Sequence, residues 1–203
     1  MNVQAVLSSL SARRPLFHSE ADFQHELAWE LRERWEPRAI RLEWPVTACE
    51  RPGALDLMVE TAHGCVGIEL KYWKKAFVGE VLGELFALKN QAAQDISRYD
   101  FWKDVARLED LVARRVLYRG YVIALTLDQA YWTASRRPTV DIDFRLHEGR
   151  AVDGPTELCW RGASVGTMRG RERPIWVKGT YRLAWHPYLS PRAGVELQAL
   201  VIE

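Results

Sequence analysis

Asp56, Glu69 and Lys71 lie close together in the sequence, and their types and spacing could do chemistry on a phosphate ester. The two carboxylates offer the oxygen ligands that Mg²⁺ or Mn²⁺ prefers. Such an ion would clamp a phosphate and lower the pKa of a bound water, while Lys71 could orient or deprotonate that water or neutralise charge in the transition state. One acid alone would hold the ion weakly, so the fold must bring both acids together.

The stretch that holds Glu69 and Lys71 has an apolar residue at every second position, which predicts a strand with one face in a core. Those apolar residues are Val66, Ile68, Leu70 and Tyr72. Glu69 and Lys71 then project from the opposite face, roughly 6.5 to 7 Å apart along the strand. Residues 54–60 also predict a strand, and the short connection 61–64 indicates an antiparallel hairpin that can place Asp56 beside them.

Helices and further strands are predicted on both sides of this hairpin. Residues 20–35 have apolar side chains at helical spacing behind Ser19, a good N-cap. Residues 39–46 alternate like a strand, and residues 51–53 indicate a turn. Residues 90–115 contain no Gly or Pro and predict the longest helix. The strongly apolar residues 118–128 predict another strand.

The segment 139–203 is predicted to be β-rich, forming a second sheet or an extended edge, because it has short alternating runs and Gly-containing turns. Its tryptophans Trp160, Trp176 and Trp185 are more typical of sheet packing than of base stacking. The net charge of the chain is +1, yet residues 161–203 hold seven basic residues against three acidic ones. A polyanion would therefore meet local basic patches. The candidate nucleic-acid contacts are Arg169, Arg171, Arg173, Lys74 and Lys75.

The composition is that of a soluble globular protein, with 203 residues, 48% of them apolar and 27% charged, and we expect a single domain, 1–203. Three cysteines without CxxC spacing argue against a disulfide framework and a zinc site. The first residues lack the order of a signal peptide, and no apolar run has the length of a membrane span. We therefore expect a cytoplasmic protein with no membrane partner.

The motif, Asp56 followed by twelve residues and then Glu69-Leu70-Lys71, resembles that of the PD-(D/E)XK phosphodiesterases, the restriction-endonuclease-like nucleases. The resemblance covers about residues 19–128. It implies that Asp56, Glu69 and the Leu70 carbonyl bind the metal and that Lys71 is catalytic. The sequence departs from the family pattern before Asp56, where Leu55 stands in place of proline.

The resemblance also implies a second tier of site residues on the two helices. The first-helix acid would be Glu20, with Glu26 and Glu30 as alternatives; Glu20 could equally be a first-turn acid that favours the helix dipole. Members similar to RecB-type nucleases carry a Gln and a Tyr on the helix after the motif. The matching positions here, spaced to share one helical face, are Gln91, Asp95 and Tyr99. We expect Glu20 and Gln91 to support catalysis.

These observations predict an α/β, restriction-endonuclease-like core over residues 19–128, with a mixed central sheet of four or five strands flanked by helices, and a β-rich C-terminal extension over 139–203. The expected activity is Mg²⁺-dependent or Mn²⁺-dependent hydrolysis of nucleic-acid phosphodiester bonds, with DNA as the first substrate and RNA as the alternative. Cutting both strands with one site per chain would call for a homodimer. The competing interpretations are a non-cleaving nucleic-acid-binding or assembly module, and a structural domain of a larger complex.

Overall fold

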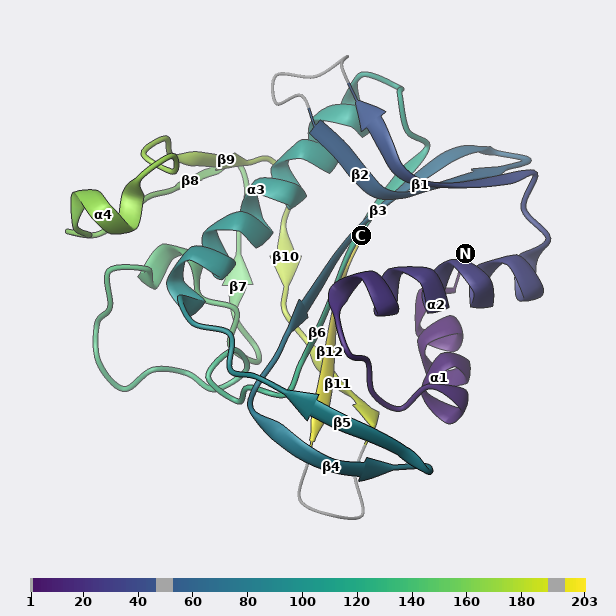
Figure 1. The fold of residues 1–203 in the computed structure, drawn as a ribbon. Helices are drawn as coiled ribbons and strands as arrows, with labels where there is room; N and C mark the ends of the chain where they lie inside the picture. Colours follow the sequence, from purple (N-terminus) through teal and green to yellow (C-terminus); the bar gives the residue numbers. More distant parts are fainter. Residues whose placement is uncertain (1, 47–52, 190–195) are drawn as a thin grey trace.

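A six-stranded sheet forms the centre of the computed structural model, which describes residues 2–46, 53–189 and 196–203 (Figure 1). Its strands, in spatial order, are β1 (Ala39–Val46), β2 (Gly53–Thr61), β3 (Gly64–Trp73), β6 (Arg119–Thr126), β12 (Leu197–Ile202) and β11 (Trp185–Leu189). The neighbours β3 and β6 run parallel, and the other neighbouring strands run antiparallel. The predicted α/β fold with a mixed central sheet is confirmed. The sheet is wider than predicted because β11 and β12, from the β-rich segment, join it.

Helices cover the two faces of this sheet (Figure 1). The helices α1 (Val3–Arg13) and α2 (Glu20–Trp35) share one apolar core with the β3 residues Val66, Ile68, Leu70 and Tyr72. The long helix α3 (Gln94–Ala113) packs in a second core on the opposite face. Side chains alternate across β3, so the predicted apolar face of this strand packs toward α2, and the opposite face turns toward α3.

The locally encoded elements agree closely with the sequence. The Ser19 hydroxyl caps α2 by accepting a hydrogen bond from the Asp22 amide at 3.1 Å. The helix ends at Glu36, which has a left-handed backbone conformation, directly before Pro37. The predicted hairpin is present as β2 and β3, closed at the Thr61–Gly64 pair. The predicted turn at 51–53 lies mostly outside the described residues.

The helix predicted over 90–115 begins later, at Gln94. The Gln91 amide donates to the Lys74 carbonyl at 3.0 Å, which ties this segment to the chain that leaves β3. Ala93, at the N-cap position, has a φ of 64°, outside the helical range. The prediction that Gln91, Asp95 and Tyr99 share one helical face is therefore wrong, because a tertiary hydrogen bond overrides the helix propensity of residues 90–93.

Several elements were not predicted or differ from expectation. The helix α1 and the hairpin of β4 (Phe77–Val81) and β5 (Glu84–Leu88) had no sequence prediction. The β-rich segment also contains two small two-stranded sheets, which pair β7 (Ala151–Val152) with β10 (Tyr181–Arg182) and β8 (Thr156–Leu158) with β9 (Ile175–Val177). The short helices η1 (Ile142–Phe144) and α4 (Val165–Met168) complete it. None of the helices in the described ranges is long and apolar enough to cross a membrane.

The tryptophans of this segment mostly pack as expected. Trp160 stacks on Tyr99 of α3, with ring centroids 5.6 Å apart, and Trp185 is buried. Trp176 on β9 is 52% exposed. Trp176 is therefore the one of these three tryptophans whose ring is open to a partner.

Candidate functional site

The site begins where β2 and β3 separate. Their ladder runs from the Thr61–Gly64 pair to the Leu57–Ile68 pair. Beyond that point β3 continues to pair with β6, as far as Trp73. Backbone N–H groups of β3 on the side of β2 therefore need other acceptors, because a buried and unpaired N–H is costly.

Carboxylates from two other elements accept these N–H groups. The Leu70 amide donates to Asp56 Oδ2 at 2.6 Å, and the Tyr72 amide donates to Glu20 Oε2 at 2.7 Å. Gln24 of α2 donates to the Asp56 carbonyl at 2.7 Å. The backbone of β3 thus fixes one acid from β2 and one from the first turn of α2 on neighbouring positions.

The side chains of Glu69 and Lys71 meet α3 on the other face of the sheet. Lys71 Nζ lies 2.7 Å from Asp104 Oδ2 and donates to the Leu70 carbonyl at 2.9 Å. Arg107 Nη2 pairs with Glu69 Oε1 and lies 3.2 Å from Asp104 Oδ1. Glu69 is 1% exposed and Asp104 3%, so the three contacts of these acids with Lys71 and Arg107 are shielded from solvent.

One polar pocket of about 330 Å³ contains the ionisable side chains of this group. It is lined by Glu20, Ala54, Asp56, Glu69, Lys71, Trp73, Gln91, Ser97, Asp100, Lys103, Asp104 and Arg107. Five carboxylates face three cations, so the formal charge of the lining is −2. An added cation would be attracted to this pocket.

The ionisable groups respond to burial and to one another. Burial raises the pKa of Glu69 to about 9, and the nearby Asp104 carboxylate acts in the same direction against Arg107. Burial also raises the pKa of Glu20 and of Asp56 above their ordinary values. Burial would lower the pKa of Lys71, but the attraction and hydrogen bond of Asp104 outweigh it and raise that pKa. Lys71 is therefore held as an ammonium, whereas the carboxyl groups of Glu20, Asp56 and Glu69 hold their protons more tightly than usual.

Glu20 is the first-helix acid that lines this pocket. The two alternatives are engaged elsewhere: Glu26 pairs with Arg13 at 2.6 Å, and Glu30 pairs with Arg34 at 2.5 Å. The structure thus distinguishes Glu20, which lines the pocket, from the two alternative acids that the sequence allowed.

Of the residues expected on the second helix, Gln91 lines the pocket, although it does so from the connection before α3. Tyr99 is buried in the core beneath α3 and donates through its hydroxyl to the Arg173 carbonyl at 2.8 Å. Asp95 accepts a hydrogen bond from the Ile96 amide at the start of α3.

Asp104 and Arg107 were missed by the sequence analysis. With Asp100 they lie at i, i+4 and i+7 on α3 and so share one helical face. The interleaved residues Val105 and Leu108 are buried. Charged residues beside the buried stripe of a helix are the signal that could have found them, since such residues are rarely buried unless paired.

The basic residues predicted to contact phosphate are placed differently from one another. Arg171 forms a two-pronged pair with Asp100, at 3.0 and 2.7 Å, and so connects its loop to the lining of the pocket. Arg169 and Arg173 on the same loop are exposed. Lys75 lies 3.5 Å from Asp128, and Lys74 is half-buried.

The donors of this pocket suit a divalent cation in type and charge. The described ranges contain no group of three or more His, Cys, Asp or Glu already arranged around one point. Asp56 and Glu69 nevertheless supply hard oxygen ligands in a lining of charge −2, and the Leu70 carbonyl, which Lys71 of this lining contacts, can add a third. A metal ion there would require Arg107 to release Glu69 and Lys71 to release the Leu70 carbonyl, because these cations contact the same oxygens.

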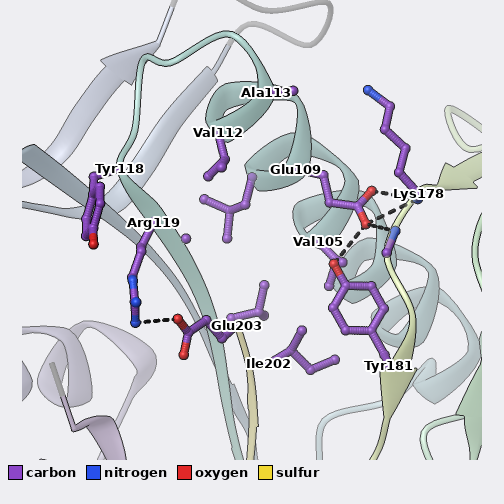
Figure 2. Close-up of a pocket in the computed structure, with 14 residues that line it drawn as sticks. Val105, Glu109, Val112, Ala113, Tyr118, Arg119, Lys178, Tyr181, Ile202 and Glu203 are labelled. Atoms are coloured by element: carbon purple, nitrogen blue, oxygen red, sulfur yellow. Dashed lines mark hydrogen bonds and ion pairs between the residues drawn. The ribbon is translucent and has the colours of Figure 1, made fainter.

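A larger pocket of about 510 Å³ lies between α3 and the strands β6, β10 and β12 (Figure 2). Its floor is mainly apolar, with Val105, Val112 and Ile202 among the lining side chains. Glu109 accepts hydrogen bonds from the backbone and from a tyrosine hydroxyl at its edge, as Figure 2 shows. This pocket contains none of the motif residues, so we assign the chemistry to the smaller, polar pocket.

Comparison of the chain with protein-family models, with curated proteins and with solved structures finds no match.

Proposed function

We propose that this protein is a metal-dependent nuclease that hydrolyses phosphodiester bonds of nucleic acid, with DNA as the first substrate and RNA as the alternative. The observation that carries the proposal is the convergence of Glu20, Asp56, Glu69 and Lys71, from α2, β2 and β3, in one acidic pocket. The mixed sheet between α2 and α3 supports a restriction-endonuclease-like core, since the resemblance of the motif implies that arrangement.

In this proposal Asp56, Glu69 and the Leu70 carbonyl would hold Mg²⁺ or Mn²⁺. The bound ion would polarise the phosphate and supply a water of lowered pKa. Glu20 positions the site, because its bond to the Tyr72 amide fixes β3 beside the N-terminus of α2.

Lys71 acts as a fixed positive charge rather than as a base. The Asp104 carboxylate at 2.7 Å raises the pKa of Lys71, so the amine stays protonated at neutral pH. An ammonium can donate hydrogen bonds to water or to a phosphate oxygen but cannot take a proton. Its role is therefore to orient the attacking water and to stabilise negative charge that develops in the transition state.

The loop of Arg169, Arg171 and Arg173 supplies the phosphate contacts in this proposal. Arg171 is anchored on Asp100 of the pocket lining, which leaves Arg169 and Arg173 exposed near it. Arginine matches phosphate geometry with two parallel N–H donors. The exposed Trp176 lies in β9, three residues after Arg173, where a base could stack on it.

One observation favours the alternative of a non-cleaving nucleic-acid-binding module. Glu69 and Asp104 are already neutralised by Lys71 and Arg107, so the acids have partners without a metal ion. A module that keeps the fold but does not cut would need only such pairs.

The two functions are separated by incubating the purified protein with plasmid, linear and single-stranded DNA and with RNA, in Mg²⁺, Mn²⁺ or EDTA. The nuclease proposal expects cutting with metal, none with EDTA, and loss of cutting in Glu69→Gln and Lys71→Met. Glu26→Gln, which removes an acid of the same helix as Glu20 outside the pocket, is the matched control and should cut normally. Tight binding with no cutting of any substrate would support the module instead.

A further inference from the structure

We infer that Arg107 is an internal cation that a divalent ion can displace. In the metal-free protein Arg107 pairs with Glu69. When the ion binds Glu69, Arg107 leaves it and binds a phosphate of the substrate in the same pocket. This inference rests on the metal site of the proposed function. It concerns a residue to which the motif assigns no role.

The guanidinium of Arg107 lies between two acids, Glu69 and Asp104. Its Nη2 contacts Glu69 Oε1 and lies 3.2 Å from Asp104 Oδ1. Its side chain is only 12% exposed. A β-carbon at Gly53 would lie 2.7 Å from Arg107 Nη1, so the glycine at the start of β2 leaves the room that the guanidinium fills. The same acid that the metal would need is thus covered by a cation of this chain.

The hydrogen-bonding capacity of Arg107 is not fully used in this position. Arg107 Nε is buried and has no hydrogen-bond partner among the described residues. A buried donor without an acceptor is unfavourable, and it gives the guanidinium a reason to move when a better acceptor arrives. A phosphate offers several acceptor oxygens in the planar geometry that an arginine fork matches.

The two cations of the site differ in how firmly they are held. Lys71 would release the Leu70 carbonyl to the metal ion but keeps Asp104, which lies 2.7 Å from its Nζ. When Arg107 moves, Asp104 keeps Lys71 as a partner, so no acid is left without a cation once the metal binds Glu69. Exchange of a single charge for a divalent ion also brings the lining closer to neutrality. Arg107 is therefore the cation that exchanges, and Lys71 the one that stays.

The test measures Mn²⁺ affinity by titration calorimetry, without nucleic acid, for the wild type, Arg107→Gln and Lys103→Gln. Lys103 is the matched control, because it lines the same pocket but pairs with Asp100, 3.4 Å away, and not with Glu69. Removing the competitor should tighten Mn²⁺ binding about tenfold in Arg107→Gln, the scale on which groups that contact metal ligands act. The Lys103→Gln change should alter it by less than about twofold, as expected for an exposed, screened charge.

Equal tightening in both variants would show a general charge effect, and weaker binding in Arg107→Gln would show that Arg107 orders the site; either result overturns the inference. If Arg107→Gln does not fold, Arg107→Lys keeps the charge, and the inference expects tighter Mn²⁺ binding because a lysine cannot form the two-acid fork. Absence of Mn²⁺ binding in every variant and in the wild type would overturn the proposed function as well. If the wild type cuts nucleic acid with metal but Arg107→Gln binds Mn²⁺ no more tightly than the wild type does, this inference alone would be overturned.

Discussion

Replacing Glu69 by glutamine should make the metal-free protein more stable while it abolishes metal binding. Glu69 is 1% exposed, and burial raises its pKa from the ordinary 4.5 to about 9. The fold therefore favours the protonated acid, and the wild type loses stability as the pH rises from about 4.5 toward that raised value. Glutamine has almost the same shape and no charge, so Glu69→Gln escapes this loss.

The size of the effect follows from the interval between the ordinary pKa and the pH of the measurement. Near pH 8, which lies below the raised pKa, folding must return a proton to Glu69, and at about 1.36 kcal/mol per pKa unit above 4.5 this costs at most about 5 kcal/mol. Weakening the contact with Arg107 gives back about 1.5–3 kcal/mol, the usual worth of a hydrogen bond to a charged group. The net gain is at most about 2–3.5 kcal/mol, or a rise in Tm of roughly 4–14 °C for a chain of this length.

The assay is thermal unfolding of the wild type and Glu69→Gln in EDTA, from about pH 5 to about pH 8. The stability difference should be small near pH 5, because this pH is close to the ordinary pKa of 4.5 that Glu69 has in the unfolded chain, and it should grow as the pH rises. Glu26→Gln, which removes an acid paired with Arg13 on the outside of α2, should show no such growth. A Glu69→Gln protein that is less stable than the wild type near pH 8 would refute the reasoning, because the pair with Arg107 would then be a net stabiliser.

Four further results are expected. Mn²⁺ affinity should rise with pH, with protons released on binding, because burial raises the pKa of Glu69 and of its neighbouring acids and a metal needs them ionised; calorimetry in buffers of different ionisation enthalpy measures this, and pH-independent affinity would contradict it. Lys71→Met should retain Mn²⁺ binding yet cut about 10²–10³-fold more slowly, measured as the single-turnover rate; an unchanged rate would remove Lys71 from catalysis. Glu109→Ala should lower the stability by about 1–3 kcal/mol in thermal unfolding, since it strands two backbone N–H groups and the Tyr181 hydroxyl, and an unchanged Tm would show that these donors find water instead. Gly67→Ala should cost about 1–3 kcal/mol in the same measurement, because its β-carbon would lie 2.5 Å from a leucine methyl carbon; a neutral change would mean that the core relaxes there.

The elements that the sequence predicts well are those whose determinants are local. The Ser19 cap and the alternation around Glu69 each lie within a few residues, so α2 and the β2–β3 hairpin could be placed closely. The segment 90–93 could not, because the bond of Gln91 to the chain after β3 is tertiary. The position of β12 beside β6 depends on a pairing between residues 72 to 80 positions apart in the sequence.

The candidate site divides in the same way. Asp56, Glu69 and Lys71 could be proposed from spacing and alternation, and the structure places them in one pocket. Asp104 and Arg107 were not found, because a charged residue on a helix is ordinarily solvated and nothing local shows that this face of α3 meets β3. Their contacts change the chemistry that the sequence suggests. Asp104 holds Lys71 as a fixed positive charge, and Arg107 covers Glu69, the expected metal ligand.

The most direct test of the central claim, that Asp56 and Glu69 share one divalent ion, is an anomalous difference map from a crystal grown with Mn²⁺. We expect one strong peak at coordination distance from a carboxylate oxygen of each residue, and no such peak in Glu69→Gln. A well-ordered pocket without a peak, in crystals of a protein that cuts DNA with Mn²⁺ under the same conditions, would contradict the claim.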